Sequence, residues 1–299
     1  MAVLKSGDLF PHEVVNEIFS KVKGHSTLSR LSNQEPIPFT GREEFIFNLN
    51  GNAQIVGEGE LKKDGGAELT SKVIKPVKIV YQARITDEFK NAAEEKQLQY
   101  LQSFVDGYAV KVAEAFDIAA LHGLEPRSME AASFKATNSF DGLVADNVVQ
   151  YDAALIEDNL ESTIDQIVTA NGDVSGLALS PQAAAALGKV KVNDVTEYPE
   201  FRFGRRPSEF NGMAVDVNKT LTTVGTGAEK DHAIVGDFAN SFKWGYAENV
   251  PLEIIEYGDP DGTGRDLKAY NEILLRAEAY IGWGILVPEN FGRVVEAGA

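Results

Sequence analysis

A long polar hairpin followed directly by a long helix constrains the fold of this chain more than any other feature. Residues 43–49 and 72–84 alternate apolar and polar side chains and predict the two arms of the hairpin. Residues 51–70 between them are rich in glycine and charge, so this tip cannot bury enough apolar area to order itself without a partner. Residues 86–122 predict a helix about 54 Å long. A protruding hairpin beside such a strut predicts a subunit that contacts neighbours rather than one that encloses a pocket.

The predicted helix has signals at both ends and one apolar stripe. Thr86 is the predicted N-cap, Gly123 the predicted C-cap and Gly107 a predicted bend. Apolar side chains recur at three- and four-residue spacing, which predicts one buried face. They are Leu98, Leu101, Phe104, Val105, Tyr108, Val112, Ala115, Phe116 and Ala119.

The rest of the chain predicts a mixture of helices and strands without an internal repeat. An amphipathic helix, residues 11–23, precedes an extended arm, residues 25–42. A second unit of helices, short strands and one charged loop follows the long helix, at residues 152–170, 176–180, 181–187, 191–211, 212–217 and 233–235. Two long strands, residues 252–257 and 267–285, come last. With no βαβαβ run, the predicted fold class is α+β.

Composition excludes several kinds of site. The chain has no Cys and four His, and no two His are three or four positions apart, so neither a thiolate site nor a two-histidine helix face can hold a metal. We predict no metal and no cofactor. No apolar run approaches the roughly 20 residues that span a bilayer, and the first residues lack a signal-peptide pattern. We therefore expect no membrane partner and a protein made and used in a cytoplasm, or inside something assembled there.

The charge argues against a protein that grips nucleic acid. The formal net charge is −17, from 28 Lys and Arg against 45 Asp and Glu, whereas phosphate binding needs a basic face. Residues 143–173 contain seven acids and no Lys or Arg, which predicts a solvated helix face. The acids are Asp146, Asp152, Glu157, Asp158, Glu161, Asp165 and Asp173.

Several short motifs have a structural interpretation that outweighs the functional one. Residues 259–262 read D-x-D-G, but a calcium loop of the EF-hand type needs Glu at its twelfth position, which here is Tyr270, so we predict a hairpin turn. The glycines at residues 57–59 and 225–227 lack the context of a phosphate loop. His122 is a predicted helix-terminal cap.

The sequence offers no candidate catalytic set. No Ser/His/Asp constellation is recognisable. An arginine group in the charged loop could bind an anion, although solvation or an ion pair with a neighbouring subunit is the preferred interpretation. It comprises Arg202, Arg205 and Arg206. An α+β hydrolase stays an alternative that would need a pocket with convergent titratable groups. We predict that the chain is not an enzyme.

Several segments, in their order along the chain, resemble a known family. The arm of the family is similar to the N-terminal segment LFPHEVVNEIFSKVKGHSTLSRLS. Its extended loop is similar to AQIVGEGELKKDGG with VIKPVKIVYQARITDEF after it, and its spine helix is similar to the long helix. The G-x-P-V strand of the family resembles FNGMAVDVNKTL, which lacks the usual Pro. Its GDF strand resembles AIVGDFANSFKWG, and its terminal strand resembles NEILLRAEAYIGWGILVPENFGRVV. The chain resembles major capsid proteins of tailed bacteriophages, of the Hong Kong 97 type.

The resemblance implies a domain division. Residues 1–42 would be an N-arm and residues 43–80 an extended loop. Residues 81–142 and 251–299 would form a peripheral domain with the spine helix, and residues 143–250 an α/β axial domain. Because the arm begins almost at Met1, we expect a separate scaffolding protein or none.

The resemblance also implies candidates for an isopeptide cross-link between subunits. A lysine of the extended loop, Lys62 or Lys63, would attack Asn271 of a neighbour, and Glu278 would accept the proton. The alternative is that the loop-tip lysines are solvated and that the subunits join without covalent bonds.

The function that the resemblance implies is a structural capsid protein that self-assembles into an icosahedral head around double-stranded DNA. Expected partners are copies of itself in hexamers and pentamers, then portal, scaffolding and decoration proteins, with only non-specific contact to packaged DNA. The expected location is the virion, assembled in the cytoplasm of a bacterial host. One alternative is an encapsulin, a bacterial compartment shell with the same fold. A decoration or tail protein is another, which the long helix disfavours.

Overall fold

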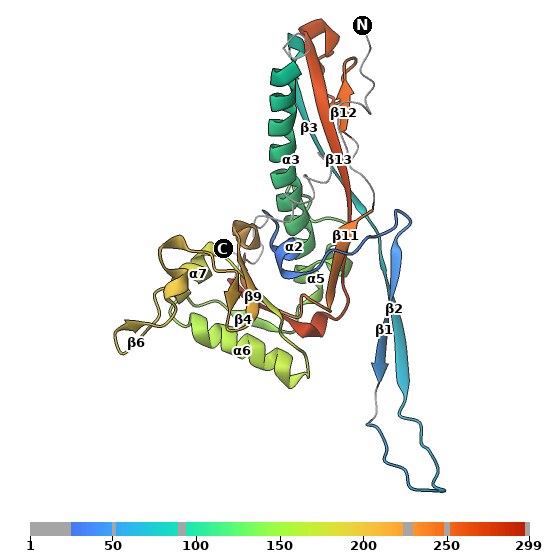
Figure 1. Ribbon diagram of the computed structural model, residues 1–299, viewed down its shortest axis with the longest axis vertical. Helices are drawn as coiled ribbons and strands as arrows, with labels where there is room; N and C mark the ends of the chain where they lie inside the picture. The colour runs from blue at the N-terminus through green and yellow to red at the C-terminus, as the bar shows by residue number, and fades with distance from the viewer. Residues whose placement is uncertain (1–24, 50–51, 89–93, 224–229, 248–251, 297–299) are drawn as a thin grey trace.

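The longest helix of the protein lies along a four-stranded antiparallel sheet, and a hairpin projects from the far end of that sheet (Figure 1). This arrangement comes from a computed structural model, which describes residues 25–49, 52–88, 94–223, 230–247 and 252–296. Within those residues no helix is both long and apolar enough to cross a membrane.

Strand β13 (Glu272–Ile285) is the centre of the four-stranded sheet. Strand β3 (Val77–Thr86) pairs along one side of it, and β11 (Phe242–Tyr246) and β12 (Leu252–Ile255) pair one after the other along its other side. Helix α3 (Glu94–His122) packs its apolar stripe on this sheet. Near the end of the helix, the Phe116 ring centroid lies 5.3 Å from that of Trp244 and 5.7 Å from that of Trp283.

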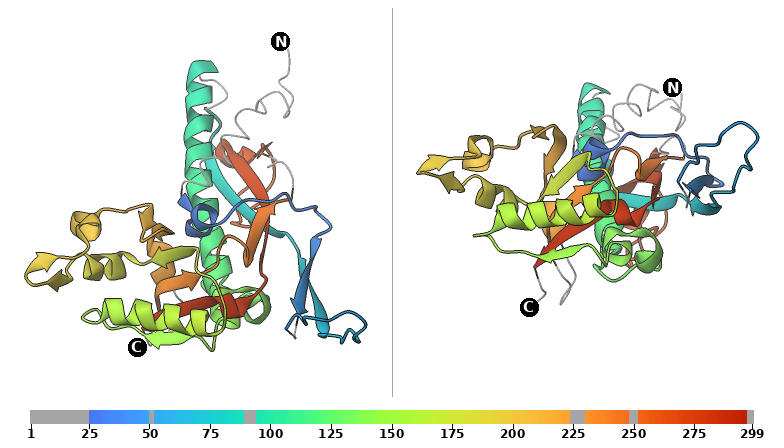
Figure 2. Two further views of the ribbon diagram at one scale, coloured as in Figure 1. Left: turned by 60° about the horizontal axis from the view of Figure 1, so that its bottom comes forward. Right: turned by 90° about the horizontal axis from the view of Figure 1, so that it is seen from below.

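A second, mixed sheet has the strand order β4-β14-β10-β5-β9-β8. Its strands are β4 (Val148–Gln150), β14 (Phe291–Glu296), β10 (Lys230–Gly236), β5 (Gly176–Leu179), β9 (Met213–Val217) and β8 (Glu209–Phe210). The buried side chains of β5 and β10 alternate between two cores: Ala178 and Ile234 face α3, and their neighbours in sequence face α6 (Ile156–Thr169) and α7 (Pro181–Leu187). Helices therefore cover both faces of this sheet (Figure 2).

Short elements complete the chain. On the α3 side of the second sheet lie α2 (Thr27–Leu31), α4 (Lys135–Asn138), α5 (Phe140–Leu143) and the 3₁₀ turn η3 (Lys219–Thr222). The others are the hairpin strands β1 (Arg42–Leu49) and β2 (Ala67–Ile74), the small strands β6 (Lys191–Val192) and β7 (Val195–Thr196), and the 3₁₀ turns η2 (Pro199–Gly204), η4 (Lys268–Tyr270) and η5 (Pro288–Asn290).

The predicted α+β class and the protruding hairpin are confirmed, but the second hairpin arm is shorter than predicted. Only β2 pairs with β1, and after Pro76 the chain continues as β3 on β13. Proline has no N–H to donate to a ladder, so it marks the place where the strand changes partner.

The predicted start of the long helix falls at the end of a strand. Thr86 is the last residue of β3, where it pairs with Glu272, and the described part of α3 begins at Glu94. Residues 89–93 lie outside the described residues, so the N-cap at Thr86 stays a prediction. The helix then continues through Gly107 without a break and ends at His122, and the φ of 62° at the next residue, Gly123, fits the predicted C-cap.

The shorter predicted elements are confirmed in part. Helix α7 has the predicted bounds, whereas α6 begins four residues later than predicted and leaves Leu155 outside it. The predicted strand 267–285 begins at Glu272, because residues 268–270 form the turn η4. The predicted helix at residues 11–23 lies outside the described residues.

Two strands cross the expected division at residues 142/143 and 250/251. Strand β11, from the expected axial segment, lies in the four-stranded sheet, and β14, from the expected peripheral segment, lies in the six-stranded sheet. The chain therefore passes between the two sheets more often than that division implies, and this ties them together.

Candidate functional site

One face of the β1–β2 hairpin is apolar and exposed. Phe47 lies opposite Leu69 and Phe45 opposite Ser71 in the pairing register, and Val73 continues the same face. Phe45, Phe47, Leu69 and Val73 are each more than half exposed. A contiguous apolar patch of this kind on a projecting element is typical of an interaction surface.

The hairpin is held only at its base by contacts within the described residues. Ile74 is buried against the four-stranded sheet, and the Lys72 Nζ donates to the Ile285 carbonyl oxygen at 2.7 Å. Arg42 forms ion pairs with Glu35 and Glu44 at 2.7 and 2.6 Å. The rest of the hairpin stands clear of the two sheets (Figure 1).

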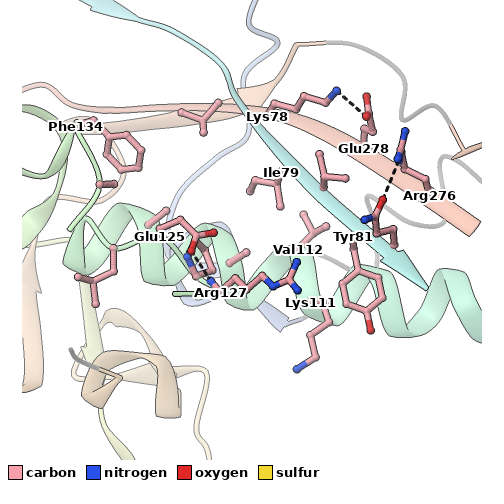
Figure 3. A pocket seen from close by; sticks show the side chains of 18 of the residues that line it. Lys78, Ile79, Tyr81, Lys111, Val112, Glu125, Arg127, Phe134, Arg276 and Glu278 are labelled. Carbon is pink, nitrogen blue, oxygen red and sulfur yellow. Dashed lines mark hydrogen bonds and ion pairs between the residues drawn. The ribbon is translucent and has the colours of Figure 1, made fainter. Parts of the chain in front are cut away.

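A groove of about 850 Å³ lies between β3, α3 and the loop of residues 124–134 (Figure 3). Its floor is apolar, with Ile79, Val112 and Phe134 among the lining residues. Several of its charged groups are paired: Lys78 bonds Glu278 at 2.6 Å, and Arg276 donates to the Gln82 side chain at 3.0 Å. The lining residues include no His or Ser. The carboxylates of Glu278 and Asp261 are bound by Lys78 and Arg84, and the Thr263 hydroxyl accepts a bond from Arg84.

The structure does not bring the cross-link candidates together within one chain. Lys62 and Lys63 are exposed at the hairpin tip. Asn271 immediately precedes β13, whereas Glu278 lies seven residues along this strand, about 23 Å away. Any Glu278 that assisted an attack on Asn271 would therefore belong to another subunit.

The D-x-D-G segment forms a turn before β13, and an arginine occupies its centre. The Arg84 guanidinium, from β3, donates to Asp259, Asp261, Thr263 and Glu272 and to the Arg265 carbonyl oxygen, with most distances between 2.7 and 3.0 Å. Hydrogen bonding to Arg84 lowers the pKa of Asp261. The predicted turn is confirmed, and the oxygens that could have bound calcium instead bind Arg84.

Near the end of α3, Asp117 anchors the N-terminal arm. Its carboxylate is fully buried and accepts bonds from the Ser26 hydroxyl at 2.6 Å, the Thr27 amide at 2.8 Å and the Thr220 hydroxyl at 3.2 Å. These donors include the first amide of α2, where a helix favours negative charge. Burial raises the pKa of Asp117 to about 7, although the hydrogen bonds lower it.

The last residue of α3 belongs to a buried ionic cluster. His122 Nε2 donates to the Thr220 carbonyl oxygen at 2.9 Å, and Nδ1 lies 3.3 Å from both Asp141 oxygens and 3.8 Å from Asp231. Arg293 from β14 bonds both carboxylates at 2.8 Å. His122 is therefore not the helix cap that the sequence suggested, because its ring bonds other elements rather than the last carbonyls of its own helix.

The ionic cluster binds a proton near neutral pH. Burial alone would lower the pKa of His122, but the hydrogen bond to Asp141 and the charges of Asp231 and Asp141 outweigh it and raise this pKa. Burial raises the pKa of Asp231 to about 7. The pKa of Asp141 is lowered, because His122 and Arg293 outweigh its burial.

The ionic cluster has the donor atoms of a metal site, but its charge does not fit one. His122, Asp141 and Asp231 each offer an atom within 4.8 Å of the others, and one Asp231 oxygen has no hydrogen-bond partner. Arg293 already supplies one positive charge, so a single proton balances the two carboxylates, whereas a divalent ion would leave a buried net positive charge. We therefore interpret the cluster as one that holds a proton rather than a metal ion.

A Ser/His/Glu arrangement also forms, which the sequence analysis missed. Ser180 Oγ lies 3.0 Å from His232 Nδ1, and His232 Nε2 lies 3.1 Å from Glu296. Ser180 is fully buried, and its hydroxyl oxygen also caps α7 by accepting the Ala183 amide. Ser180 does not line the groove beside β3, and the Tyr151 ring stacks on His232 with the two centroids 3.7 Å apart, so we assign this set to capping and packing.

Comparisons with known proteins agree on one family and fold. The model of the phage capsid family matches residues 6–295. A solved structure from Mycobacterium phage Ogopogo is 30% identical, with a TM-score of 0.77 over 91% of this chain and 92% of that chain. One from Gordonia phage Cozz is 24% identical, with a TM-score of 0.69 over 94% and 86% of the two chains.

A more distant structure shares the fold. It is described as "Capsid of empty GTA particle computed with C5 symmetry", and it is 13% identical with a TM-score of 0.60 over 91% of this chain and 90% of that chain. No curated protein sequence matches the chain.

We expect Arg84→Ala to lower the Tm of the unassembled subunit by several degrees, because it leaves the neighbouring carboxylates of Asp259 and Asp261 without a cation and Glu272 with Arg265 alone. Millimolar calcium should restore part of the loss, since the freed oxygens suit that ion. Arg265→Ala, which removes a half-exposed partner of Glu272, is the matched control and should show a smaller, calcium-independent change. An Arg84→Ala protein with an unchanged Tm would contradict the account.

We expect the free energy of unfolding to be higher near pH 6 than near pH 8, by roughly 1–2 kcal/mol. The raised pKa of His122 gives stability that is complete below the unfolded pKa and is lost as pH rises through the folded pKa. Asp231 and Asp117 have pKa values of about 7, so the free energy of unfolding also falls as pH rises and these two buried groups ionise. Asp141, with a lowered pKa, loses its contribution only in acid. Urea unfolding of the unassembled subunit measures the difference.

His122→Gln is the matched variant for this pH dependence, because it keeps an amide donor for the Thr220 carbonyl and cannot take up a proton near neutral pH. In this variant the free energy of unfolding should change less with pH, because only the buried carboxyl groups of Asp231 and Asp117 still contribute. A slope equal to that of the native chain would show that His122 does not hold the proton.

Proposed function

The chain belongs to the phage capsid family and is a structural protein of the icosahedral shell, and we propose that its copies join through the apolar face of the β1–β2 hairpin. The observation that supports this proposal is the exposure of Phe45, Phe47, Leu69 and Val73 on one face of an element held only at its base. Burying each of them against a second copy contributes about 1–2 kcal/mol. Closure of a shell multiplies such modest contacts over many copies.

The comparisons favour the phage shell over an encapsulin, because the matched family is that of phage capsids and the structures named above come from phages and a GTA particle. Two observations disfavour the hydrolase alternative: Lys78 and Arg84 bind the Glu278 and Asp261 carboxylates of the groove, and Ser180 is buried. The account of a structural protein therefore needs no enzymatic step.

We further propose the partners and division of labour that the family resemblance implies. Residues 1–42 would reach a neighbour as an arm, and residues 43–80 would be the extended loop. The four-stranded sheet with α3 would join rings to one another, and the six-stranded sheet would line each ring. Portal, scaffolding and decoration proteins would act on the same shell in the host cytoplasm, and the net charge of −17 would keep its contact with packaged DNA non-specific.

We expect Phe45→Ser combined with Phe47→Ser to abolish shell formation while the subunit stays folded, because both side chains are exposed before assembly. Negative-stain electron microscopy and sedimentation measure assembly, and circular dichroism measures folding. Tyr257→Ser removes a similarly exposed aromatic side chain elsewhere and should assemble like the native chain. Native-like shells from the hairpin variant would overturn the proposed contact.

We propose that the shell is held without covalent bonds, because Lys78 of its own chain already binds the Glu278 carboxylate that would have to accept the proton. Mature particles should therefore give a single monomer band on a denaturing gel. A ladder of bands would contradict this, and its loss in Lys62→Arg with Lys63→Arg would identify the attacking lysine.

A further inference from the structure

The loop before β8 carries an arginine group that has no acidic partner among the described residues of its own subunit. The side chains of Arg202, Arg205 and Arg206 are exposed, and none forms an ion pair within the part of the chain that the structure describes. Arg202 bonds only the Thr196 hydroxyl and lies with its guanidinium carbon 5.1 Å from the centroid of the Phe203 ring. In a protein of net charge −17, three unpaired arginines in five positions are a distinct local feature.

Phe203 in the same loop combines exposure with backbone strain. Its side chain is 92% exposed, and its φ of 59° lies in the left-handed region, which bulky residues rarely adopt. Apart from the Arg202 guanidinium beside it, the ring lies in solvent. Such strain is common at binding sites, where a partner makes use of the geometry.

An acidic surface lies on the other flank of the same sheet. Helix α6 covers the β4-β14-β10 side, whereas Tyr198 and Phe201 pack the loop on Phe210 of β8, the last strand on the opposite edge. The outer face of α6 exposes Asp158, Glu161 and Asp165, in a stretch without Lys or Arg. Tyr198 reaches Glu157 at the start of α6, but the arginines beyond it do not pair with these acids.

Opposite charges on two flanks of one domain suit a head-to-tail ring. A cyclic assembly brings two different surfaces of the subunit together at every contact, and it closes when the rotation fits. The related GTA capsid is described with C5 symmetry. Both flanks belong to the domain that the proposed function assigns to the rings.

We propose that the arginine loop, residues 202–206, binds the acidic outer face of α6 on the next copy of this chain around each ring, with Phe203 at the centre of the contact. The proposal rests on the proposed function, since it names the partner surface within the shell. Arginine pairs readily with carboxylates through its planar fork, and the contact weakens as salt screens it. Nucleic acid is the other possible anion, but the net charge of −17 opposes it.

A charge-reversal cycle tests the pairing. Arg205→Glu with Arg206→Glu, and separately Glu161→Lys with Asp165→Lys, should each reduce the yield of shells at least about tenfold at low salt. The combination of all four should restore assembly, and its net charge equals that of the native chain, because the two pairs of changes cancel. Circular dichroism and sedimentation of the unassembled proteins show that each variant is folded.

The outcomes separate the inference from the proposed function. Failure of the native chain to form shells would overturn the proposed function and this pairing with it. Native shells with full assembly of the Arg205→Glu, Arg206→Glu variant, or with no recovery in the fourfold variant, would overturn the pairing alone. Loss of nucleic acid from the arginine variant without loss of shells would also overturn it, in favour of an anion site.

Phe203→Gly gives a second, independent readout. Glycine adopts the left-handed backbone freely, so the Tm of the unassembled subunit should not fall and should rise by about 1–3 °C. The yield of shells should fall, because the ring is lost from the contact. A variant with unchanged assembly would remove Phe203 from the proposed contact.

Discussion

Two buried ionisable residues near the C-terminal end of α3 connect the two halves of this protein. Asp117 accepts donors from the N-terminal arm and from Thr220, and His122 bonds the Thr220 carbonyl and faces the carboxylates that Arg293 of β14 holds. Because an unpaired buried charge is far more costly than a paired one, the arm, α3, η3, α5, β10 and β14 must keep one relative arrangement. The position of the six-stranded sheet against the helix follows from this polar network.

With the two sheets fixed in this way, three surfaces of the single subunit have no partner among its described residues. The hairpin projects an apolar face that nothing in the described part of the chain covers, and the arginine loop and the acidic face of α6 lie on different flanks without pairing. Each of these surfaces is small, so a pair of copies gains little. A closed shell repeats them around every subunit, and the sum is large while single contacts stay reversible.

Local patterns predicted those parts of the fold that depend on neighbouring residues in the sequence. The apolar stripe of α3, the Pro181 start of α7 and the turn at Asp259 were readable because helix periodicity, proline and Asp-Gly pairs act over a few residues. Thr86 has the chemistry of a cap, but only the tertiary structure shows that it also pairs with β13 as the last residue of β3. The arginine at the centre of the acidic turn and the ionic cluster were not predictable, since Arg84 lies 175 positions from Asp259 and Arg293 lies 152 positions from Asp141.

The most direct test of the central claim is the structure of the assembled particle by electron cryo-microscopy, with the exposure of the hairpin face as the measured quantity. The account predicts a closed icosahedral shell in which Phe45 and Phe47, now 64% and 63% exposed, are buried against a neighbouring copy. A shell in which these side chains stay in solvent, with neighbours joined elsewhere, would contradict it.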